Sequence, residues 1–223
     1  MSAAAILAWY LIPSLAIGGV LLSSAGRFDV PVVWWVYLGL WLLVSVVGAL
    51  GSDPGLVQER LHPGPGARES FPLAALIAGA LTSSHLAIAG LDVGRFHWSD
   101  SVPSELEWAG LAVLAASLAI SQWASSANRF FSSVVRIQSE RGHYVVSSGP
   151  YAYVRHPGYA GAIGVALSSG VALGSWLSML PSLLAVALLV RRIPREECVL
   201  RQELPGYASY QGRVRYRLVP GLW

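Results

Sequence analysis

The chain is poor in charge: charged residues make up only 12% of its 223 residues, about half the share in an ordinary soluble domain. Hydrophobic residues make up 54%. Several apolar runs approach or exceed the ~20 residues that span a bilayer, so we predict a polytopic integral membrane protein. Lysine is absent, so all 15 basic residues are arginines. These arginines flank apolar runs as topology signals do, so the pI near 9.2 does not indicate a nucleic-acid partner.

Cysteine is nearly absent as well. A single residue, Cys198, excludes an intrachain disulfide, and the spacing of Cys and His indicates no zinc site. We therefore expect no metal. The sequence also lacks a G-x-G-x-x-G element after a strand, which excludes a soluble Rossmann-type domain.

What the chain has instead is a series of apolar runs, which predict an all-α fold of about six transmembrane helices. From Pro157 to Val190 no residue is charged, a run too long for one span and short for two. Because Gly170, Gly174 and Ser175 lie near its middle, we expect a turn there and a tight C-terminal helical hairpin. The four earlier spans are predicted at about 3–22, 31–50, 71–91 and 105–127.

Two details refine this picture of the helices. Gly158, Gly161 and Gly164 give the fifth span a face of small residues for close helix contact. Trp34 and Trp35 suit an aromatic belt at the membrane interface. We divide the chain into an N-terminal four-helix part (1–127) and a C-terminal core (128–223) within one structural domain.

Arginine placement predicts the orientation. Six spans put both termini on one side, where the connections and the tail hold thirteen arginines, Arg68 among them. The other side has only Arg27 and Arg95. Because positive charge marks the cytoplasmic side, we expect the termini and the polar connections that follow to be cytoplasmic. The absence of lysine and the compact core suggest a bacterial inner (plasma) membrane.

One connection, from Gln138 to Gly161, concentrates polar chemistry. It holds two histidines, three tyrosines after its midpoint, and paired Gly and Pro residues. Proline fixes the backbone and glycine lets it turn sharply or approach a ligand, while tyrosine faces in a dry pocket attract cations. An interfacial anchor of amphipathic tyrosines explains the same residues, so these residues alone leave site and anchor open.

A second polar cluster begins at Arg191, where the apolar run ends. Arg192 and Glu196 are four residues apart and share a helix face. Pro194 fits the first turn of a new helix, whose N-terminus Glu196 and Glu197 would favour. Positive-inside anchoring with a surface ion pair explains the arginines but not two adjacent glutamates at the membrane exit, so the two clusters together favour a site.

These elements resemble the isoprenylcysteine carboxyl methyltransferase family and, more distantly, phospholipid methyltransferases. The resemblance covers about 128–223, and the segment 53–60 is similar to bacterial members. It rests on these motifs: His143-Tyr-Val-Val, Gly149-Pro-Tyr, Arg155-His-Pro-Gly-Tyr-Ala-Gly161, Arg192, Glu196-Glu197, Tyr207-Ala-Ser-Tyr210 and Arg213-Val-Arg-Tyr-Arg-Leu-Val-Pro-Gly221.

The resemblance implies an enzyme that uses S-adenosylmethionine, with S-adenosylhomocysteine as product, in a cytoplasm-facing pocket at the membrane boundary. It also implies that Glu196 holds the cofactor and that Arg192 is catalytic and faces the methyl acceptor. The sulfonium of such a cofactor suits aromatic faces, and its ammonium suits a carboxylate. The other residues implied for the pocket are Gln138, His143, Tyr144, Val145, Val146, Tyr151, His156, Pro157, Gly158 and Tyr159.

The acceptor is expected to be lipidic, since it must reach a site beside the fifth span from the bilayer; membrane lipids are the other expected partners. A carboxylate acceptor needs no general base, whereas an amine, as in phospholipid N-methylation, needs one. Two other classes stay open. A sterol-reductase-like NADPH enzyme shares an Arg-His-Pro-x-Tyr-x-Gly-like element but predicts a longer chain. A non-enzymatic membrane scaffold is the other.

Two features lie outside this motif set. His85 is ionisable within the third span, which makes it a functional candidate by default. We favour a neutral histidine bonded to a neighbouring helix. For the loop 51–70, Asp53-Pro54-Gly55 is a strong turn signal, and we favour a membrane-surface turn, although Glu59 and Arg60 are placed where they could gate a site.

Overall fold

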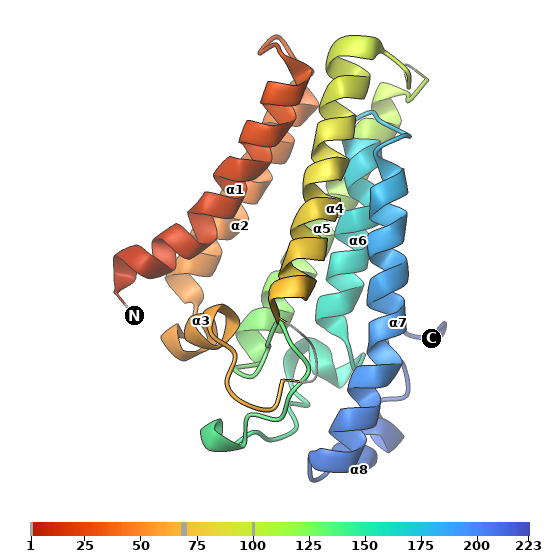
Figure 1. Ribbon diagram of the computed structural model, residues 1–223. Coiled ribbons are helices and arrows are strands. Elements are labelled where there is room, and N and C mark those ends of the chain that lie inside the picture. The colour runs from red at the N-terminus through yellow and green to blue at the C-terminus, as the bar shows by residue number, and fades with distance from the viewer. Residues whose placement is uncertain (1, 68–70, 100) are drawn as a thin grey trace.

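The protein is an all-helical bundle in the computed structural model, which describes residues 2–67, 71–99 and 101–223 (Figure 1). Within these ranges no strand occurs. Arg68, one of the arginines that predict the orientation, lies outside the described residues. The long helices are α1 (Ala3–Ala25), α2 (Val32–Gly51), α4 (Phe71–Leu91), α5 (Ser104–Ala127), α6 (Pro157–Ala172) and α7 (Met179–Glu203), and the short ones are α3 (Pro54–Leu61) and α8 (Tyr207–Arg213).

Among the residues that the structure describes, four helices are long and apolar enough to cross a membrane. The chain is therefore an integral membrane protein, and the four N-terminal spans predicted from the sequence are confirmed to within a few residues. The third span continues beyond α4 through one π-helical turn, η1 (Asp92–Phe96). The four helical segments are Ala3–Ala25, Val32–Gly51, Pro72–Phe96 and Ser104–Ala127.

The predicted C-terminal hairpin is also confirmed. α6 ends at Ala172, and the chain turns at Gly174, whose positive φ of 74° favours glycine, before α7 begins. With 16 residues, α6 is about 24 Å long, less than the ~30 Å hydrocarbon core. The assignment of α6 and α7 as the fifth and sixth membrane spans therefore remains a prediction.

The predicted helix start at Pro194 is wrong. α7 passes through Pro194 without a break and ends only at Glu203. Ile193 and Glu197, on either side of the proline, are buried. Packing of both neighbouring turns against the protein holds the helix continuous where Pro194 removes a backbone hydrogen bond.

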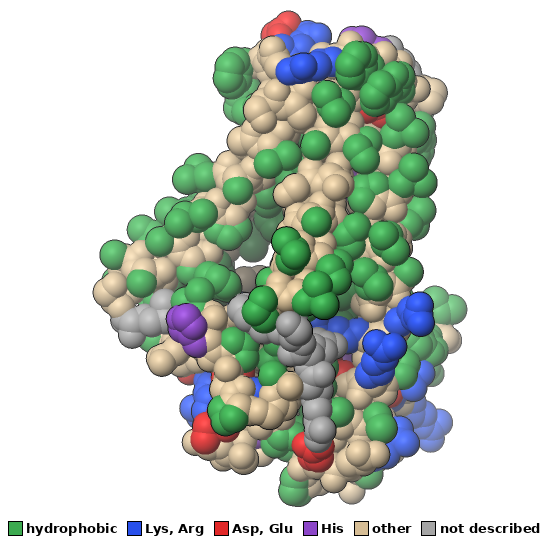
Figure 2. Space-filling model, viewed as in Figure 1, with side chains coloured by type: hydrophobic (Ala, Val, Ile, Leu, Met, Phe, Trp, Pro, Cys, Tyr) green, Lys and Arg blue, Asp and Glu red, His purple; other side chains and the backbone are tan. Residues whose placement is uncertain are grey.

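The connections divide between the two ends of the bundle (Figure 1). The turns that join α1 to α2, η1 to α5 and α6 to α7 lie at one end. The other end carries α3, the connection 128–156 and α8. Figure 2 shows that hydrophobic side chains cover the side of the bundle between its two ends. Charged side chains gather at the two ends.

Tight packing joins the helices of the core. Trp34, predicted for an interfacial belt, is instead fully buried, and its indole Nε1 donates to the carbonyl of Leu173 at 3.1 Å; Trp35 beside it is exposed. Gly161 and Gly164 of α6 face Ser117 and neighbouring atoms of α5 so closely that a Cβ would approach them within 2.2 Å. The predicted close helix contact is therefore confirmed for Gly161 and Gly164, whereas a Cβ on Gly158 would meet Phe131 of the connection after α5.

Candidate functional site

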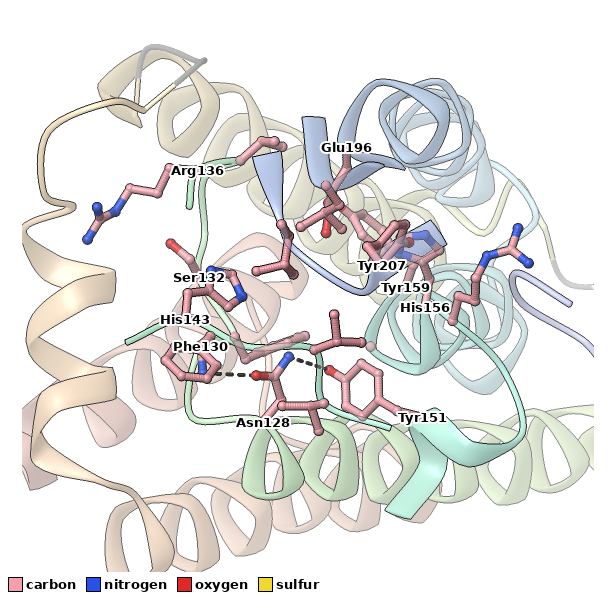
Figure 3. Close-up of a pocket in the computed structure, with 18 of the residues that line it drawn as sticks. Asn128, Phe130, Ser132, Arg136, His143, Tyr151, His156, Tyr159, Glu196 and Tyr207 are labelled. Carbon is pink, nitrogen blue, oxygen red and sulfur yellow. Dashed lines mark hydrogen bonds between the residues drawn. The ribbon is translucent and has the colours of Figure 1, made fainter. Parts of the chain in front are cut away.

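The connection after α5 encloses a cavity at the end of the bundle that carries α3 and α8 (Figure 3). Residues 128–148 follow α5 with only one short helical turn, η2 (Ser139–Arg141), and a second turn, η3 (Gly149–Ala152), leads towards α6. Side chains of α6, α7 and α8 complete the walls. The cavity has a volume of about 250 Å³.

An aromatic wall forms around Phe130. Its ring stacks on the imidazole of His143 at 4.4 Å and meets Tyr144 edge-on at 5.1 Å. Nearby, Asn128 accepts a hydrogen bond from the backbone N–H of Phe130 and donates to the hydroxyl of Tyr151, as the dashed lines in Figure 3 show. Burial raises the pKa of Tyr151 to about 12, so its phenol stays protonated and neutral.

His143 is held as a neutral donor. The backbone N–H of Gln138 donates to its Nδ1 at 3.2 Å, so the proton of the neutral ring resides on Nε2. Burial, together with the positive charges of Arg136 and Arg141, lowers the pKa of His143 to about 4. At neutral pH this wall therefore offers an uncharged N–H group.

The predicted Arg192 and Glu196 reach the cavity from one face of α7. Glu196 Oε2 accepts a hydrogen bond from the hydroxyl of Tyr159 at 2.6 Å. The guanidinium of Arg192 donates to the carbonyl of Ser133 at 2.7 Å and lies over the Tyr159 ring, 6.0 Å from its centroid. α6, α7 and the connection after α5 thus meet at these two side chains.

Glu197, next to Glu196 on α7, accepts hydrogen bonds from three side chains. Its Oε1 accepts from Arg155 Nε at 2.6 Å and from His156 Nε2 at 3.2 Å, and its Oε2 accepts from Arg217 Nε at 2.9 Å. Burial alone would raise the pKa of Glu197, but the hydrogen bonds from His156, Arg155 and Arg217 outweigh it and lower that pKa to about 2. Glu197 is therefore an anion at every physiological pH.

The C-terminal tail forms hydrogen bonds with the same segment, where the connection enters α6. The backbone N–H groups of Arg155 and His156 donate to the carbonyls of Tyr216 and Arg217, each at 2.9 Å. Arg155 also donates through its side chain to two tail carbonyls, those of Val214 and Arg215. The segment that leads into α6 is thus clamped between α7 and the tail.

Side chains of α3 bind the connection after α5 that lines the cavity. Arg136 and Glu59 form a buried two-pronged ion pair with both N–O distances at 2.7 Å, and Glu59 also accepts from Ser132. Arg60 donates to the carbonyl of Phe131 at 3.1 Å. The loop at 51–70, for which we favoured a plain surface turn, therefore contributes a helix whose charged side chains fix the connection that lines the cavity.

Of the twelve residues that the resemblance assigns to the site, the structure brings ten into the cavity lining. Gln138 and Pro157 are buried but are not part of that lining. Gln138 lies behind the wall, where its Nε2 donates to the carbonyl of Phe130 and its Oε1 accepts from Arg141. The ten are His143, Tyr144, Val145, Val146, Tyr151, His156, Gly158, Tyr159, Arg192 and Glu196.

Other lining residues did not emerge from the sequence as site residues. Arg155 and Tyr207 belong to motifs quoted above, but nothing in their spacing assigned them a role. The segment before Gln138 gave no signal at all, because an isolated Phe, Ser or Val in a connection is typical of many structures. The cavity residues of this kind are Asn128, Phe130, Phe131, Ser132, Ser133, Val134, Val135, Arg136, Arg155, Ala162, Leu189, Leu200, Leu204, Tyr207 and Tyr210.

The residues described contain no group of three or more His, Cys, Asp or Glu side chains placed to hold a metal ion. The cavity lining instead combines aromatic faces, two imidazoles, one carboxylate and three guanidinium groups. These groups suit an organic ligand that has a flat part and charged parts. The fold and the cavity thus define an integral membrane protein with a candidate site for an organic ligand at one end of a helical bundle.

Comparison with known proteins finds a family match for part of the chain. Residues 108–202, from α5 into α7, match the isoprenylcysteine carboxyl methyltransferase (ICMT) family. The match confirms the predicted resemblance over this segment.

Similar proteins include the probable protein-S-isoprenylcysteine O-methyltransferase of Oryza sativa subsp. japonica, 38% identical over 78 residues, which are 34% of this chain and 41% of the relative. The protein-S-isoprenylcysteine O-methyltransferase of Schizosaccharomyces pombe is 39% identical over 90 residues, which are 40% of this chain and 38% of the relative. The chain therefore spans about two-fifths of the length of these curated relatives.

Proposed function

We propose that this protein is an S-adenosylmethionine-dependent methyltransferase that methylates a carboxylate on a lipidic acceptor. The observation that supports it most is the pairing, in one cavity, of aromatic faces with Glu196 and Arg192; both residues lie in the segment that matches the ICMT family. The names of the relatives, which are O-methyltransferases, support a carboxyl rather than an amine acceptor.

The chemistry of the lining fits this cofactor. S-Adenosylmethionine supplies an electrophilic methyl group on a sulfonium centre. Tyr159, whose ring also faces Arg192, offers an aromatic face to a cation, and Glu196 offers a carboxylate to an ammonium. Phe130, Tyr144 and the neutral imidazole of His143 form a mainly apolar aromatic wall that suits an adenine ring.

Arg192 suits the acceptor's carboxylate. Its planar guanidinium can donate two parallel hydrogen bonds, and its contact with the Ser133 carbonyl fixes its position at the cavity wall. A carboxylate attacks as an anion and releases no proton, so the site needs no general base. The contribution of the protein is then to hold the two reactants in line and to exclude water.

The exposed apolar side of α7 supports a lipidic acceptor. Leu184 and Leu188 are exposed apolar residues on the helix that carries Arg192. Leu189, the next residue along the chain, lines the cavity. An acyl or prenyl chain that packs along this flank would therefore place a polar head group near Arg192.

Isothermal titration of the purified protein with S-adenosylhomocysteine tests the proposal. We expect saturable binding and a melting temperature that rises with ligand concentration, because the ligand binds only the folded state. NADPH should give no heat. Binding of NADPH in place of S-adenosylhomocysteine, in each of several detergents, would replace a methyltransferase with a reductase.

Two substitutions on one face of α7 should separate cofactor from acceptor. Glu196→Gln removes the charge opposite the ammonium and should weaken S-adenosylhomocysteine binding by about 1.5–3 kcal/mol, the range for a hydrogen bond to a charged group. Arg192→Lys keeps the charge but loses the planar fork, so turnover should fall while cofactor affinity stays nearly constant. If neither substitution changes cofactor affinity, Glu196 is not part of the cofactor site.

A further inference from the structure

Two tyrosines on one face of α8 have contrasting surroundings. Tyr207 and Tyr210 are both buried, with exposed fractions of 4% and 2%, and both line the cavity. The hydroxyl of Tyr210 donates to the carbonyl of Tyr151 at 2.7 Å. The hydroxyl of Tyr207 is buried and has no hydrogen-bond partner among the residues described.

A buried hydroxyl without a hydrogen bond lowers the stability of the fold, and buried tyrosine hydroxyls usually have a hydrogen-bond partner. Glu197, whose negative charge acts on this phenol, already accepts from Arg155, His156 and Arg217, and Glu196 accepts from Tyr159. The protein therefore leaves this hydroxyl for a ligand in the cavity.

The surroundings of Tyr207 favour one end of such a ligand. Burial raises the pKa of Tyr207, and the negative charge of Glu197 raises it further, so the phenol keeps its proton and can donate. Glu196 and Arg155 also act on it electrostatically. Figure 3 shows Tyr207 on the same side of the cavity as Glu196 and Tyr159, away from Phe130 and His143.

Acidic side chains thus act on Tyr207, whereas the aromatic wall around Phe130 lies on the other side of the cavity. With an ammonium at Glu196, the amino-acid end of the cofactor lies on the side of Tyr207 and the adenine ring lies at Phe130. At that end only the α-carboxylate is purely an acceptor of hydrogen bonds.

We propose that the hydroxyl of Tyr207 donates a hydrogen bond to the α-carboxylate of the bound S-adenosyl cofactor. This inference rests on the proposed function. It makes Tyr207 a cofactor-binding residue contributed by α8, beyond the segment that matches the family.

The test is Tyr207→Phe, with Tyr210→Phe as the matched control. Tyr207→Phe deletes a hydroxyl that no described residue binds, so the melting temperature of the free protein should stay the same or rise. Affinity for S-adenosylhomocysteine should fall about three- to tenfold, the loss of one hydrogen bond. Tyr210→Phe removes a hydroxyl that donates to the Tyr151 carbonyl, so it should instead lower the melting temperature.

A second ligand locates the contact on the cofactor. Decarboxylated S-adenosylhomocysteine (S-adenosyl-3-thiopropylamine) lacks only the α-carboxylate. Tyr207→Phe should weaken S-adenosylhomocysteine binding but leave the affinity for this analogue unchanged. An equal loss for both ligands would move the hydrogen bond to another group of the cofactor and overturn the assignment.

The outcomes separate this inference from the proposed function. If the unaltered protein does not bind S-adenosylhomocysteine, the methyltransferase proposal fails. If it binds and Tyr207→Phe binds equally well, the methyltransferase proposal stands and the role of Tyr207 is refuted.

Discussion

Glu197 shows how a single residue can hold together segments far apart in the chain. It joins α7 to the entry of α6 through Arg155 and His156, and to the tail through Arg217. Its neighbour Glu196 faces the cavity instead. Two adjacent glutamates at the end of the apolar run thus have separate tasks, one structural and one proposed for the cofactor.

Glu197→Gln should therefore lower the free energy of unfolding rather than change the proposed methyl transfer. It leaves the buried Arg155 without a counter-charge, and loss of one partner of a buried ion pair costs about 3–5 kcal/mol. Thermal or denaturant unfolding in detergent measures this loss. Glu140→Gln is the control, because its side chain is 50% exposed and should cost no more than about 1 kcal/mol. Equal losses for the two variants would mean that Glu197 is not the stabilising centre.

His143 predicts how stability changes with pH. Its pKa is 6.5 as a free side chain and about 4 in the folded protein, so the unfolded chain binds the proton first as pH falls. The stabilisation is complete above pH 6.5 and should be lost between pH 6.5 and 4. Melting temperatures of the unaltered protein and of His143→Asn should diverge across this window, with the flatter profile in the variant. Parallel profiles would show that His143 is not held neutral.

Sequence reasoning found the residues of local motifs but not their distant partners. His143, Glu196 and the residues around Tyr159 were identified because their types and short spacings resemble a family. The Arg136–Glu59 pair joins residues 77 apart in the chain, and Arg155–Glu197 joins residues 42 apart. No periodicity or spacing encodes such pairings, because they depend on how the helices pack.

At the scale of helices, small residues decide how closely α6 approaches α5. Gly161 allows a contact in which an added Cβ would lie 2.2 Å from Ser121 Oγ and 2.7 Å from the Ser117 carbonyl. The backbone carbonyl cannot move aside without shifting the helix. The packing of α6, which presents Tyr159 to the cavity, therefore depends on this glycine.

Gly161→Ala should lower stability by about 1–3 kcal/mol, the usual cost of an overfilled core. Gly79→Ala in α4 is the matched control, because a Cβ there would meet no atom within 4 Å. Unfolding of both variants in the same detergent provides the comparison. A Gly161→Ala protein as stable as the control would mean that α5 and α6 separate easily.

His85 links α4 to the C-terminal hairpin and is not part of the cavity lining. Its Nε2 lies 2.7 Å from Ser169 Oγ of α6, and its Nδ1 lies 2.8 Å from the Ser178 carbonyl just before α7. The favoured structural role for this histidine is thereby supported over a place in the candidate site. The sequence could place His85 in a span but could not tell which helices it would join.

His85→Ala should thus lower stability by about 1 kcal/mol, from two interhelical hydrogen bonds of about 0.6 kcal/mol each. S-Adenosylhomocysteine affinity should stay unchanged. Melting temperature and calorimetry on the same preparation measure the two effects. A variant that loses affinity but keeps its stability would give His85 a functional role.

For the molecule as a whole, hydropathy predicted the four N-terminal spans well because membrane helices satisfy their own backbone hydrogen bonds. Hydropathy alone does not identify the last two helices as membrane spans, because α7 has a charged end and α6 is shorter than the hydrocarbon core. Orientation rests on arginine placement alone. The single cysteine offers a direct measurement, because Cys198 is exposed on the part of α7 beyond Arg192.

A membrane-impermeant maleimide should label Cys198 in inverted inner-membrane vesicles but not in intact cells, since we expect this end of the bundle to be cytoplasmic. In a Cys198→Ser background, Phe28→Cys should show the reverse, because Phe28 is 75% exposed in the turn between α1 and α2 at the other end. Labelling of Cys198 from outside the cell would invert the predicted topology.

The hydrogen bonds that join the entry of α6 and Glu197 to the tail also set the order in which these contacts can form during synthesis. A ribosome releases Arg155 and Glu197 well before Val214 to Arg217, whose carbonyls and guanidinium bind these two side chains. Every helix of the bundle is thus synthesised before the last partners of Glu197 emerge. A nascent chain arrested before Val214 should therefore be unable to retain a ligand, so binding competence would arise only after Val214 to Arg217 have emerged.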